Sequence, residues 1–215
     1  MEIIPSLLVN SQEKFFAGLL GLGDCVRMLQ IDIADGEFVP NVTWADPGII
    51  APRLRLECEL HLMVKDPVGV AEKWRAVTQV KRVLFHYEAS PDIPAVLQKL
   101  KTFGWEVSLV LNPETPLEAI EPYLSQIQGI MLMGIIPGFQ GQPFIPATYE
   151  RARRSKLMYP SHYLEIDGGV NENTIPGFIA AGVDAVCPGS AVFGHEKTPR
   201  ENVARLQSLI TGLTK

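Results

Sequence analysis

The sequence predicts a closed (β/α)8 barrel, the TIM barrel, formed by one domain that covers residues 1–215. Short apolar runs typical of buried strands recur at intervals of roughly 25 residues. Stretches of helical length with amphipathic spacing lie between them. Eight strand-and-helix units favour the closed barrel, because an open doubly wound sheet usually has fewer units and a G-x-G-x-x-G turn after its first strand. That turn is missing from this chain.

The predicted strands and helices follow one another with no long Ser/Gly-rich linker between them. The strand candidates are residues 2–8, 27–33, 58–64, 82–88, 106–112, 129–135, 162–168 and 184–190. The clearest helix candidates are residues 11–23, 66–77, 92–104 and 147–158. Residues that commonly cap helices mark helix starts at Ser11, Asp66, Thr115 and Asn173. This alternation is the order expected of a parallel barrel, so we predict a single domain.

Composition indicates a globular protein with a sizeable core. Hydrophobic residues make up 47% of the chain and the net charge is -5, which argues against disorder and against binding to nucleic acid. The most basic run, Arg151 to Lys156, falls within a helix candidate and is expected to be a solvated helix face. Neither a signal peptide nor an apolar run long enough to span a membrane is recognisable. The three cysteines stand far apart, without a CxxC pair, and predict buried free thiols in a reduced, cytoplasmic protein.

Polar residues inside three of the strand candidates share one face. Side chains alternate along a strand, so residues two apart point to the same side. The polar faces are formed by Gln30 and Asp32, by Glu59, His61 and Met63, and by Glu165 and Asp167. The opposite faces are aliphatic and are expected to contact the surrounding helices. In barrels of this type the active site lies at the C-terminal ends of the strands, so polar residues there are candidates for function.

Asp32, His61 and Asp167 stand at equivalent strand ends. A single aspartate before a turn is usually a turn former, and a lone histidine in a strand is usually a core residue. The coincidence of all three favours a functional site, because isolated buried charges are costly without a partner. Carboxylate and imidazole ligands that converge on one point suit a divalent transition metal. Two carboxylates from different strands also suit acid/base chemistry on opposite faces of a substrate.

Glycine-rich stretches follow the last three strand candidates. They are "PGFQGQPF" (residues 137–144), "DGGV" (167–170) and "PGSAVFG" (188–194). Barrels of this type often bind phosphate with the loops after their last strands, where glycines let backbone N–H groups approach the anion. Together these loops predict a phosphorylated small-molecule ligand.

The motifs, in this order, resemble the ribulose-phosphate 3-epimerase family over nearly the whole chain. The similarity rests on "IIPSLL", "IDIADGEFVPN", "ELHLMVKDP", "LFHYEA", "VLNPETP", "MGIIPGFQGQPF", "IDGGV" and "GSAVF". The resemblance implies a TIM barrel of the ribulose-phosphate-binding type that interconverts D-ribulose 5-phosphate and D-xylulose 5-phosphate in the pentose phosphate pathway. It also implies a homo-oligomer and one divalent metal ion, for which Zn, Fe, Mn and Co are the candidates.

The resemblance further implies roles for individual residues. Asp32 and Asp167 would move the C3 proton: one removes it, and the other returns it on the opposite face of a cis-enediolate. Both aspartates and His61 would ligate the metal. The expected contacts to the substrate and its phosphate are Ser6, Met63, Met133, Gly138, Gly141, Gly168, Gly169, Gly189 and Ser190.

Several positions depart from the family pattern. Gln30 stands where the family usually has a histidine that is the fourth protein ligand, and an amide oxygen is a weaker ligand than imidazole for zinc- or iron-like ions. Ala34 replaces a methionine, which leaves the wall over the reacting carbons open. Glu37, Gly134 and Gln140 replace histidine, threonine and glycine. These changes lie close to the expected active site.

Three functions stay open at this point. The first is a metal-dependent 3-epimerase, acting on ribulose 5-phosphate or on another ketose phosphate such as a hexulose 6-phosphate. The second is a sugar-phosphate-binding protein of the same fold with little or no catalysis. The third is a decarboxylase or aldolase of a related barrel branch, which typically carries Asp-x-Lys-x-x-Asp on strand three. The equivalent "ELHLMVKD" has no lysine between Glu59 and His61, so the epimerase is favoured and the third function is the weakest.

Overall fold

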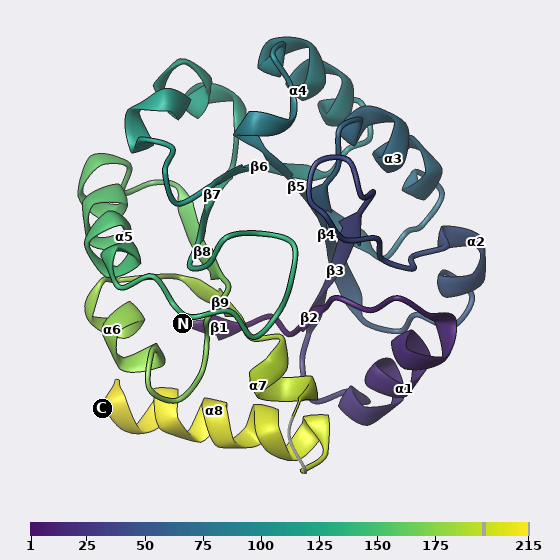
Figure 1. Ribbon diagram of the computed structural model, residues 1–215, viewed down its shortest axis with the longest axis vertical. Helices are drawn as coiled ribbons and strands as arrows, with labels where there is room; N and C mark the ends of the chain where they lie inside the picture. Colours follow the sequence, from purple (N-terminus) through teal and green to yellow (C-terminus); the bar gives the residue numbers. More distant parts are fainter. Residues whose placement is uncertain (195–196, 215) are drawn as a thin grey trace.

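A ring of parallel strands lies inside a ring of helices in the computed structural model, which describes residues 1–194 and 197–214 (Figure 1). The strands are β1 (Glu2–Ile3), β2 (Ser6–Leu7), β3 (Met28–Ala34), β4 (Glu57–Met63), β5 (Val80–His86), β6 (Glu106–Leu111), β7 (Gly129–Met133), β8 (Tyr163–Asp167) and β9 (Ala185–Cys187). Each of the eight predicted runs contains strand residues, and neighbours pair in parallel, so the predicted barrel is confirmed.

The first predicted strand is divided into β1 and β2 around Pro5. Proline has no N–H to give to a sheet, so a strand interrupts its ladder there. On one side of the break β1 pairs with β9, and on the other side β2 pairs with β3. The Pro5 carbonyl accepts the Gln30 N–H at 2.9 Å, and the Ile4 N–H donates to the Val186 carbonyl at 3.0 Å. The divided strand therefore lies between β9, the last strand, and β3, and its pairing on both sides closes the barrel.

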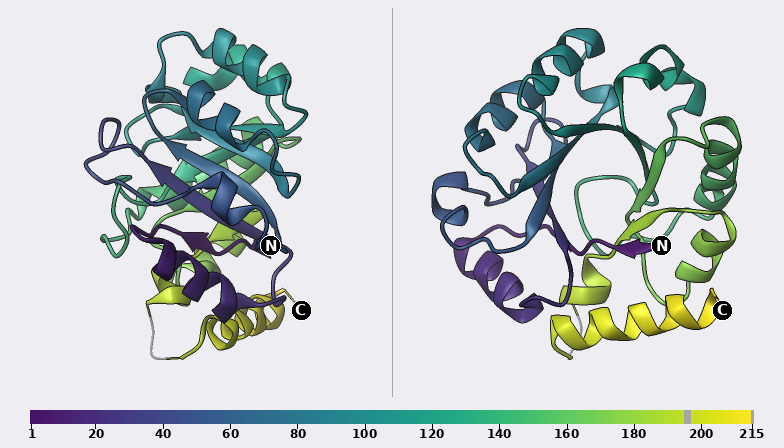
Figure 2. Two further views of the ribbon diagram at one scale, coloured as in Figure 1. Left: turned by 90° about the vertical axis from the view of Figure 1, so that its right-hand side faces the viewer. Right: turned by 180° about the vertical axis from the view of Figure 1, so that it is seen from behind.

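Helices cover the outside of the barrel in all three views (Figures 1 and 2). They are α1 (Gln12–Leu22), α2 (Pro47–Ile50), α3 (Pro67–Trp74), α4 (Ile93–Lys101), α5 (Ala147–Met158), α6 (Ile175–Ala180), α7 (Ser190–Phe193) and α8 (Pro199–Leu213), with 3-10 segments η1 (Tyr87–Ala89) and η2 (Leu117–Gln126). The segment between β6 and β7 is a 3-10 helix, and Pro122 lies inside it. None of the helices within residues 1–194 and 197–214 is both long and apolar enough to cross a bilayer.

Two of the four predicted helix starts agree with the structure. Ser11 and Asp66 each accept a backbone N–H from the first turn, as predicted. The starts predicted at Thr115 and Asn173 are wrong by one residue, because the next residue in each case is the cap. The Thr115 hydroxyl instead donates to the Glu88 carboxylate.

The basic run on α5 is only in part the solvated face that we expected. Arg153 and Arg154 are exposed. Arg151 is half-buried and donates from its guanidinium to the backbone carbonyls of Asn112, Pro113 and Thr115 in the loop after β6. This arginine therefore fixes a loop at the C-terminal end of the barrel.

The strands bury both faces, as parallel strands in a barrel do. Their outer aliphatic faces form the large core against the helices, while the barrel interior holds a smaller apolar cluster together with polar side chains. The buried polar residues of the interior include Gln30, Asp32, Glu59, His61, Arg82, Glu165 and Asp167. The predicted division into aliphatic and polar faces is confirmed. Cys58 and Cys187 are buried free thiols, whereas Cys25 is only half-buried.

Candidate active site

A small cavity of ≈ 40 Å³, partly open to solvent, lies at the C-terminal ends of the strands. Asp32 and Asp167 are in its wall, with the buried side chains of Met63 and Met133 beside them. The other predicted site residues that line the cavity are Ser6, Gly138, Gly141, Gly168, Gly169, Gly189 and Ser190. His61 and Gln30 are fully buried and contact both aspartates from below the cavity.

Neighbouring strands bring His61 between the two aspartates. Asp32 on β3 is in register with His61 on β4, and Asp167 is the last residue of β8. The His61 Nδ1 atom lies 3.0 Å from Asp32 Oδ1 and 3.1 Å from Asp167 Oδ2. We call these three side chains the upper polar layer. The sequence placed them at equivalent strand ends, and the closed barrel brings them into contact.

Gln30 begins one step lower in the barrel, in register with Glu59, and its amide reaches up into the upper polar layer. Its Nε2 atom donates to Asp32 Oδ1 at 2.8 Å and to Asp167 Oδ2 at 2.9 Å, and lies 3.3 Å from His61 Nδ1. The amide nitrogen therefore stands at the point on which all three side chains converge. The Gln30 Oε1 atom is buried without a hydrogen-bond partner.

The close contacts perturb the ionisation of this layer. Burial raises the pKa of the Asp32 carboxyl; the nearby Asp167 charge adds to this, and the hydrogen bond with His61 opposes it. Burial alone would lower the pKa of His61, but its hydrogen bonds to Asp167 and Asp32 raise that pKa to about 10. The two carboxylates thus demand a positive charge between them, supplied here by an imidazolium.

A divalent metal ion fits the same donor set. Asp32, His61 and Asp167 each offer a ligand atom, and these atoms all lie within 4.8 Å of one another. Two carboxylate oxygens and an imidazole nitrogen are ligands that first-row divalent ions accept. The orphaned Gln30 Oε1 is a buried acceptor that lacks a partner, and rotation of the amide would turn it towards the same point. The residues present therefore fit a metal with three or four protein ligands.

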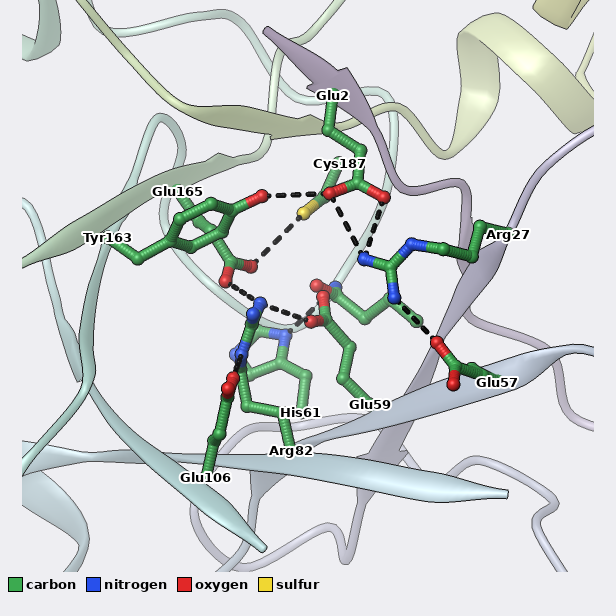
Figure 3. Close-up of polar contacts among 11 residues, drawn as sticks. Glu2, Arg27, Glu57, Glu59, His61, Arg82, Glu106, Tyr163, Glu165 and Cys187 are labelled. Carbon is green, nitrogen blue, oxygen red and sulfur yellow. Dashed lines mark hydrogen bonds and ion pairs between the residues drawn. The ribbon is translucent and has the colours of Figure 1, made fainter.

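A second buried cluster of charged side chains, in which one guanidinium contacts two carboxylates, lies two residues earlier along β4 and β8 (Figure 3). We call Glu59, Arg82 and Glu165 the lower polar layer. Arg82 Nη1 donates to Glu59 Oε2 at 3.0 Å and to Glu165, and Arg82 Nε donates to Glu106 at 3.1 Å. Glu59, Glu165 and Cys187 also have metal-ligand chemistry, but the guanidinium lies between the two carboxylates. Burial raises the pKa of the Cys187 thiol well above its ordinary value, which disfavours the thiolate that a metal needs.

The glycine-rich loops form the rim of the cavity, and close packing with a positive φ requires glycine at position 168. Gly168 has φ +94°, and a Cβ atom at this position would lie 2.4 Å from the Ile135 side chain. A Cβ atom on Gly189 would lie 2.3 Å from the Gln140 amide nitrogen. Gln140 also lines the cavity, and its amide nitrogen donates to the Ser6 carbonyl at 3.4 Å.

From the sequence, His86 in "LFHYEA" is either a core histidine, which is favoured, or a residue that supports a metal ligand from behind. It is fully buried, and its Nε2 atom lies 3.0 Å from His61 Nε2. His86 is the last residue of β5 and shares the inward face with Arg82, four residues earlier. The two-residue alternation of side chains that identified His61 therefore also places His86 on the inward face of its strand.

Known proteins resemble this chain over its whole length. The family model described as "Ribulose-phosphate 3 epimerase family" matches residues 2–193. The ribulose-phosphate 3-epimerase of Aquifex aeolicus is 36% identical over 218 residues, covering 97% of this chain and 96% of the relative. The cytoplasmic isoform of Oryza sativa is 33% identical over 222 residues, with 98% and 95% covered.

Solved structures of lower sequence identity share the fold. KGPDC from Streptococcus mutans in complex with D-R5P has a TM-score of 0.75 at 12% identity, covering 99% of this chain and 98% of that chain. Orotidine 5'-phosphate decarboxylase from Pyrococcus horikoshii has a TM-score of 0.70 at 16% identity, with 97% and 99% covered. These two likenesses concern the barrel alone. The family match and the full-length relatives go further: the chain belongs to the ribulose-phosphate 3-epimerase family.

Proposed function

We propose that this protein is a 3-epimerase of a ketose phosphate, and that it interconverts D-ribulose 5-phosphate and D-xylulose 5-phosphate. The observation that carries the proposal is the meeting of two carboxylates, Asp32 and Asp167, from non-adjacent strands in the wall of one cavity. The family membership and the names of the full-length relatives support the same reaction.

Inversion at C3 needs one base and one acid. One carboxylate takes the C3 proton, and the electron pair of the C3–H bond moves into an enediolate between C2 and C3. The other carboxyl group delivers a proton to the opposite face of C3, so the centre inverts and the proton count is unchanged. Such a pair must hold one proton between them. Burial of Asp32, with Asp167 close by, raises the pKa of the Asp32 carboxyl and favours this state.

Asp32, His61 and Asp167 would hold a divalent ion, and the Gln30 oxygen would join them once its amide turns. The ion would supply positive charge beside the oxygens that become negative as the enediolate forms. In the absence of the ion, the Gln30 amide donates one hydrogen bond to each carboxylate and so holds both in place. The ion's identity among Zn, Fe, Mn and Co stays a prediction.

The rest of the cavity suits a phosphorylated sugar. Met63 and Met133 give an apolar wall from which water is excluded near the reacting carbons. Ser6, which lines the cavity, would hydrogen-bond the sugar. The phosphate would lie against the glycine-rich rim formed by Gly138, Gly141, Gly168, Gly169, Gly189 and Ser190. The homo-oligomer, the single domain and the cytoplasmic location also stay predictions.

A sugar-phosphate-binding protein without catalysis is the second candidate, and Gln30 is the observation that favours it. Its amide nitrogen occupies the point where the ligands converge and satisfies both carboxylates. The decarboxylase or aldolase hypothesis loses support, because no lysine lines the cavity within residues 1–194 and 197–214.

The direct test is to incubate the protein with D-ribulose 5-phosphate in D2O and to follow both xylulose 5-phosphate formation and deuterium at C3. Parallel reactions contain Zn²⁺, Fe²⁺, Mn²⁺ or Co²⁺, and hexulose 6-phosphates are compared under the same conditions. We expect deuterium at C3 together with conversion of the pentulose phosphate. Saturable binding of ribulose 5-phosphate without deuterium incorporation in any metal would instead identify a binding protein.

A further inference from the structure

A buried line of polar contacts leads outward from His61, away from the cavity. His61 and His86 are both fully buried, and their Nε2 atoms lie 3.0 Å apart. The two rings are close to parallel, with an interplanar angle of 23°. One of these two nitrogens must carry the proton that they share, because two bare lone pairs would repel at this distance.

The far side of His86 faces acceptors. His86 Nδ1 lies 2.9 Å from the Asn112 Oδ1 atom and 3.6 Å from the Glu88 Oε2 atom. That Glu88 oxygen has no hydrogen-bond partner of its own among the described residues. Asn112 is fixed in turn, since its N–H donates to Glu88 Oε1 at 3.1 Å and its carbonyl accepts from Arg151 at 3.1 Å. The Asn112 amide turns its Oδ1 atom towards His86, so both neighbours of His86 Nδ1 are acceptors, and this side of His86 favours a proton on Nδ1.

The direction of the shared hydrogen bond follows from this arrangement. A neutral imidazole has one donor nitrogen and one acceptor nitrogen. With its proton on Nδ1, His86 presents a lone pair at Nε2, and His61 must donate from its own Nε2. The remaining nitrogen of His61, Nδ1, then faces Asp32 and Asp167.

We propose that Asn112, Glu88 and His86 form a positioning unit that keeps the His61 proton on Nε2 and directs His61 Nδ1 towards the two aspartates as the metal-binding nitrogen. This deepens the proposed function and rests on its metal site. None of the three residues touches the substrate in this account. They act through His61, whose ring orientation and tautomer they fix, as outer hydrogen bonds do for metal-ligating histidines.

The first test measures Zn²⁺ affinity by competition with a chromophoric chelator, with no substrate present. His86→Leu removes the acceptor, whereas His86→Gln keeps an acceptor oxygen. We expect His86→Leu to bind Zn²⁺ about 10- to 100-fold more weakly, and His86→Gln to recover most of the loss. The matched pair at the outer end is Asn112→Leu and Asn112→Asp, with a smaller loss expected in the leucine variant only. Equal affinity in wild type and a folded His86→Leu variant would overturn the proposal.

The second test needs no variant. The ¹⁵N and ¹H spectra of histidine-labelled wild-type protein report which ring nitrogens carry protons. We expect a proton on His86 Nδ1 and on His61 Nε2 in both the metal-free and the Zn²⁺-loaded protein, and Zn²⁺ bonded to His61 Nδ1. A proton on His86 Nε2, a doubly protonated His86, or Zn²⁺ on His61 Nε2 would refute the proposal. A protein that binds no Zn²⁺ still reports both tautomers, and neither test depends on epimerase activity, so failure of the proposed reaction is distinguishable.

Discussion

The two polar layers inside the barrel share strands β4 and β8 and the same side-chain alternation, yet they differ in the cation that lies between their carboxylates. Strand β4 supplies Glu59 to the lower layer and His61 to the upper one, and β8 supplies Glu165 and Asp167 in the same way. The lower layer carries its own guanidinium, from Arg82, between its carboxylates. The carboxylates of the upper layer have between them the His61 ring, which can lose a proton, and the neutral amide of Gln30, and the layer opens into the cavity.

This difference shows what separates a ligand-binding cluster of carboxylates from a purely structural one in this barrel. A buried carboxylate pair that holds a fixed arginine between its oxygens has no room there for a metal ion, and removing the arginine leaves buried charge unpaired. A carboxylate pair beside a cavity, neutralised by groups that can turn or lose a proton, can exchange them for a metal or a substrate. The predictions below separate these two roles.

The largest effect is expected from the aspartates of the upper layer. Asp32→Asn and Asp167→Asn each remove a proton-transfer group, so we expect C3 exchange with solvent deuterium to fall by about 10³-fold or more. Ribulose 5-phosphate binding should stay within several-fold of wild type, because the phosphate rim is intact. Glu59→Gln is the matched carboxylate-to-amide change in the lower layer and should leave exchange nearly unaltered. Undiminished exchange in both asparagine variants would refute the two-aspartate mechanism.

The next effect concerns stability and the lower layer. Arg82→Met leaves Glu59 and Glu165 buried without their cation, and we expect the free energy of unfolding to fall by about 3–5 kcal/mol. Urea denaturation of the metal-free protein measures it. Arg27→Met is the control: Arg27 pairs with Glu2 and Glu57 at the surface, and such exposed pairs contribute about 1 kcal/mol or less. Equal losses in the two variants would remove the assigned structural role of the lower layer.

A smaller effect is expected at Gln30. Gln30→His replaces a weak amide ligand by imidazole, and we expect Zn²⁺ affinity to rise about tenfold, or about 1.4 kcal/mol. Gln30→Leu offers no ligand atom and serves as the comparison. Chelator competition measures both. If the histidine variant bound Zn²⁺ no more tightly than the leucine variant, position 30 would lie outside the metal site.

The smallest effect is a pH dependence of stability from the lower layer. Burial, with Glu165 close by, raises the pKa of Glu59 well above that of a free glutamate, and burial raises the pKa of Glu165 to about 7. Between the unfolded value near 4.5 and these folded values, the folded protein binds more protons than the unfolded chain. The free energy of unfolding should therefore fall as pH rises through this window. Glu59→Gln makes one of these groups permanently neutral, so the free energy of unfolding, measured by urea titration, should change less steeply with pH in this variant. The same pH dependence in wild type and variant would contradict the prediction.

The sequence alone predicted the barrel, the aliphatic and polar strand faces and the convergence of Asp32, His61 and Asp167, because each depends on short-range alternation and on the shared geometry of strand ends. Partners were harder to predict. The Gln30 amide meets Asp167, which is 137 positions later in the chain, so no local pattern reports the contact. Arg82 shares the inward face of β5 with His86. Side-chain alternation predicts this shared face, but it does not predict how deep in the barrel each side chain lies or which residue it contacts. Pro5 is plain in the sequence, but its role in closing the barrel is not. That role follows only from the strand pairing, in which β1 pairs with β9 and β2 pairs with β3.

The central claim is that the upper polar layer binds the metal and the lower layer does not. Isothermal titration of the metal-free protein with Zn²⁺ tests it most directly, in wild type, Asp167→Asn and Glu59→Gln. We predict about one ion per chain in wild type, the same in Glu59→Gln, and binding at least about 100-fold weaker in Asp167→Asn. Zn²⁺ binding that survives Asp167→Asn and is lost in Glu59→Gln, or no binding in wild type, would contradict the account.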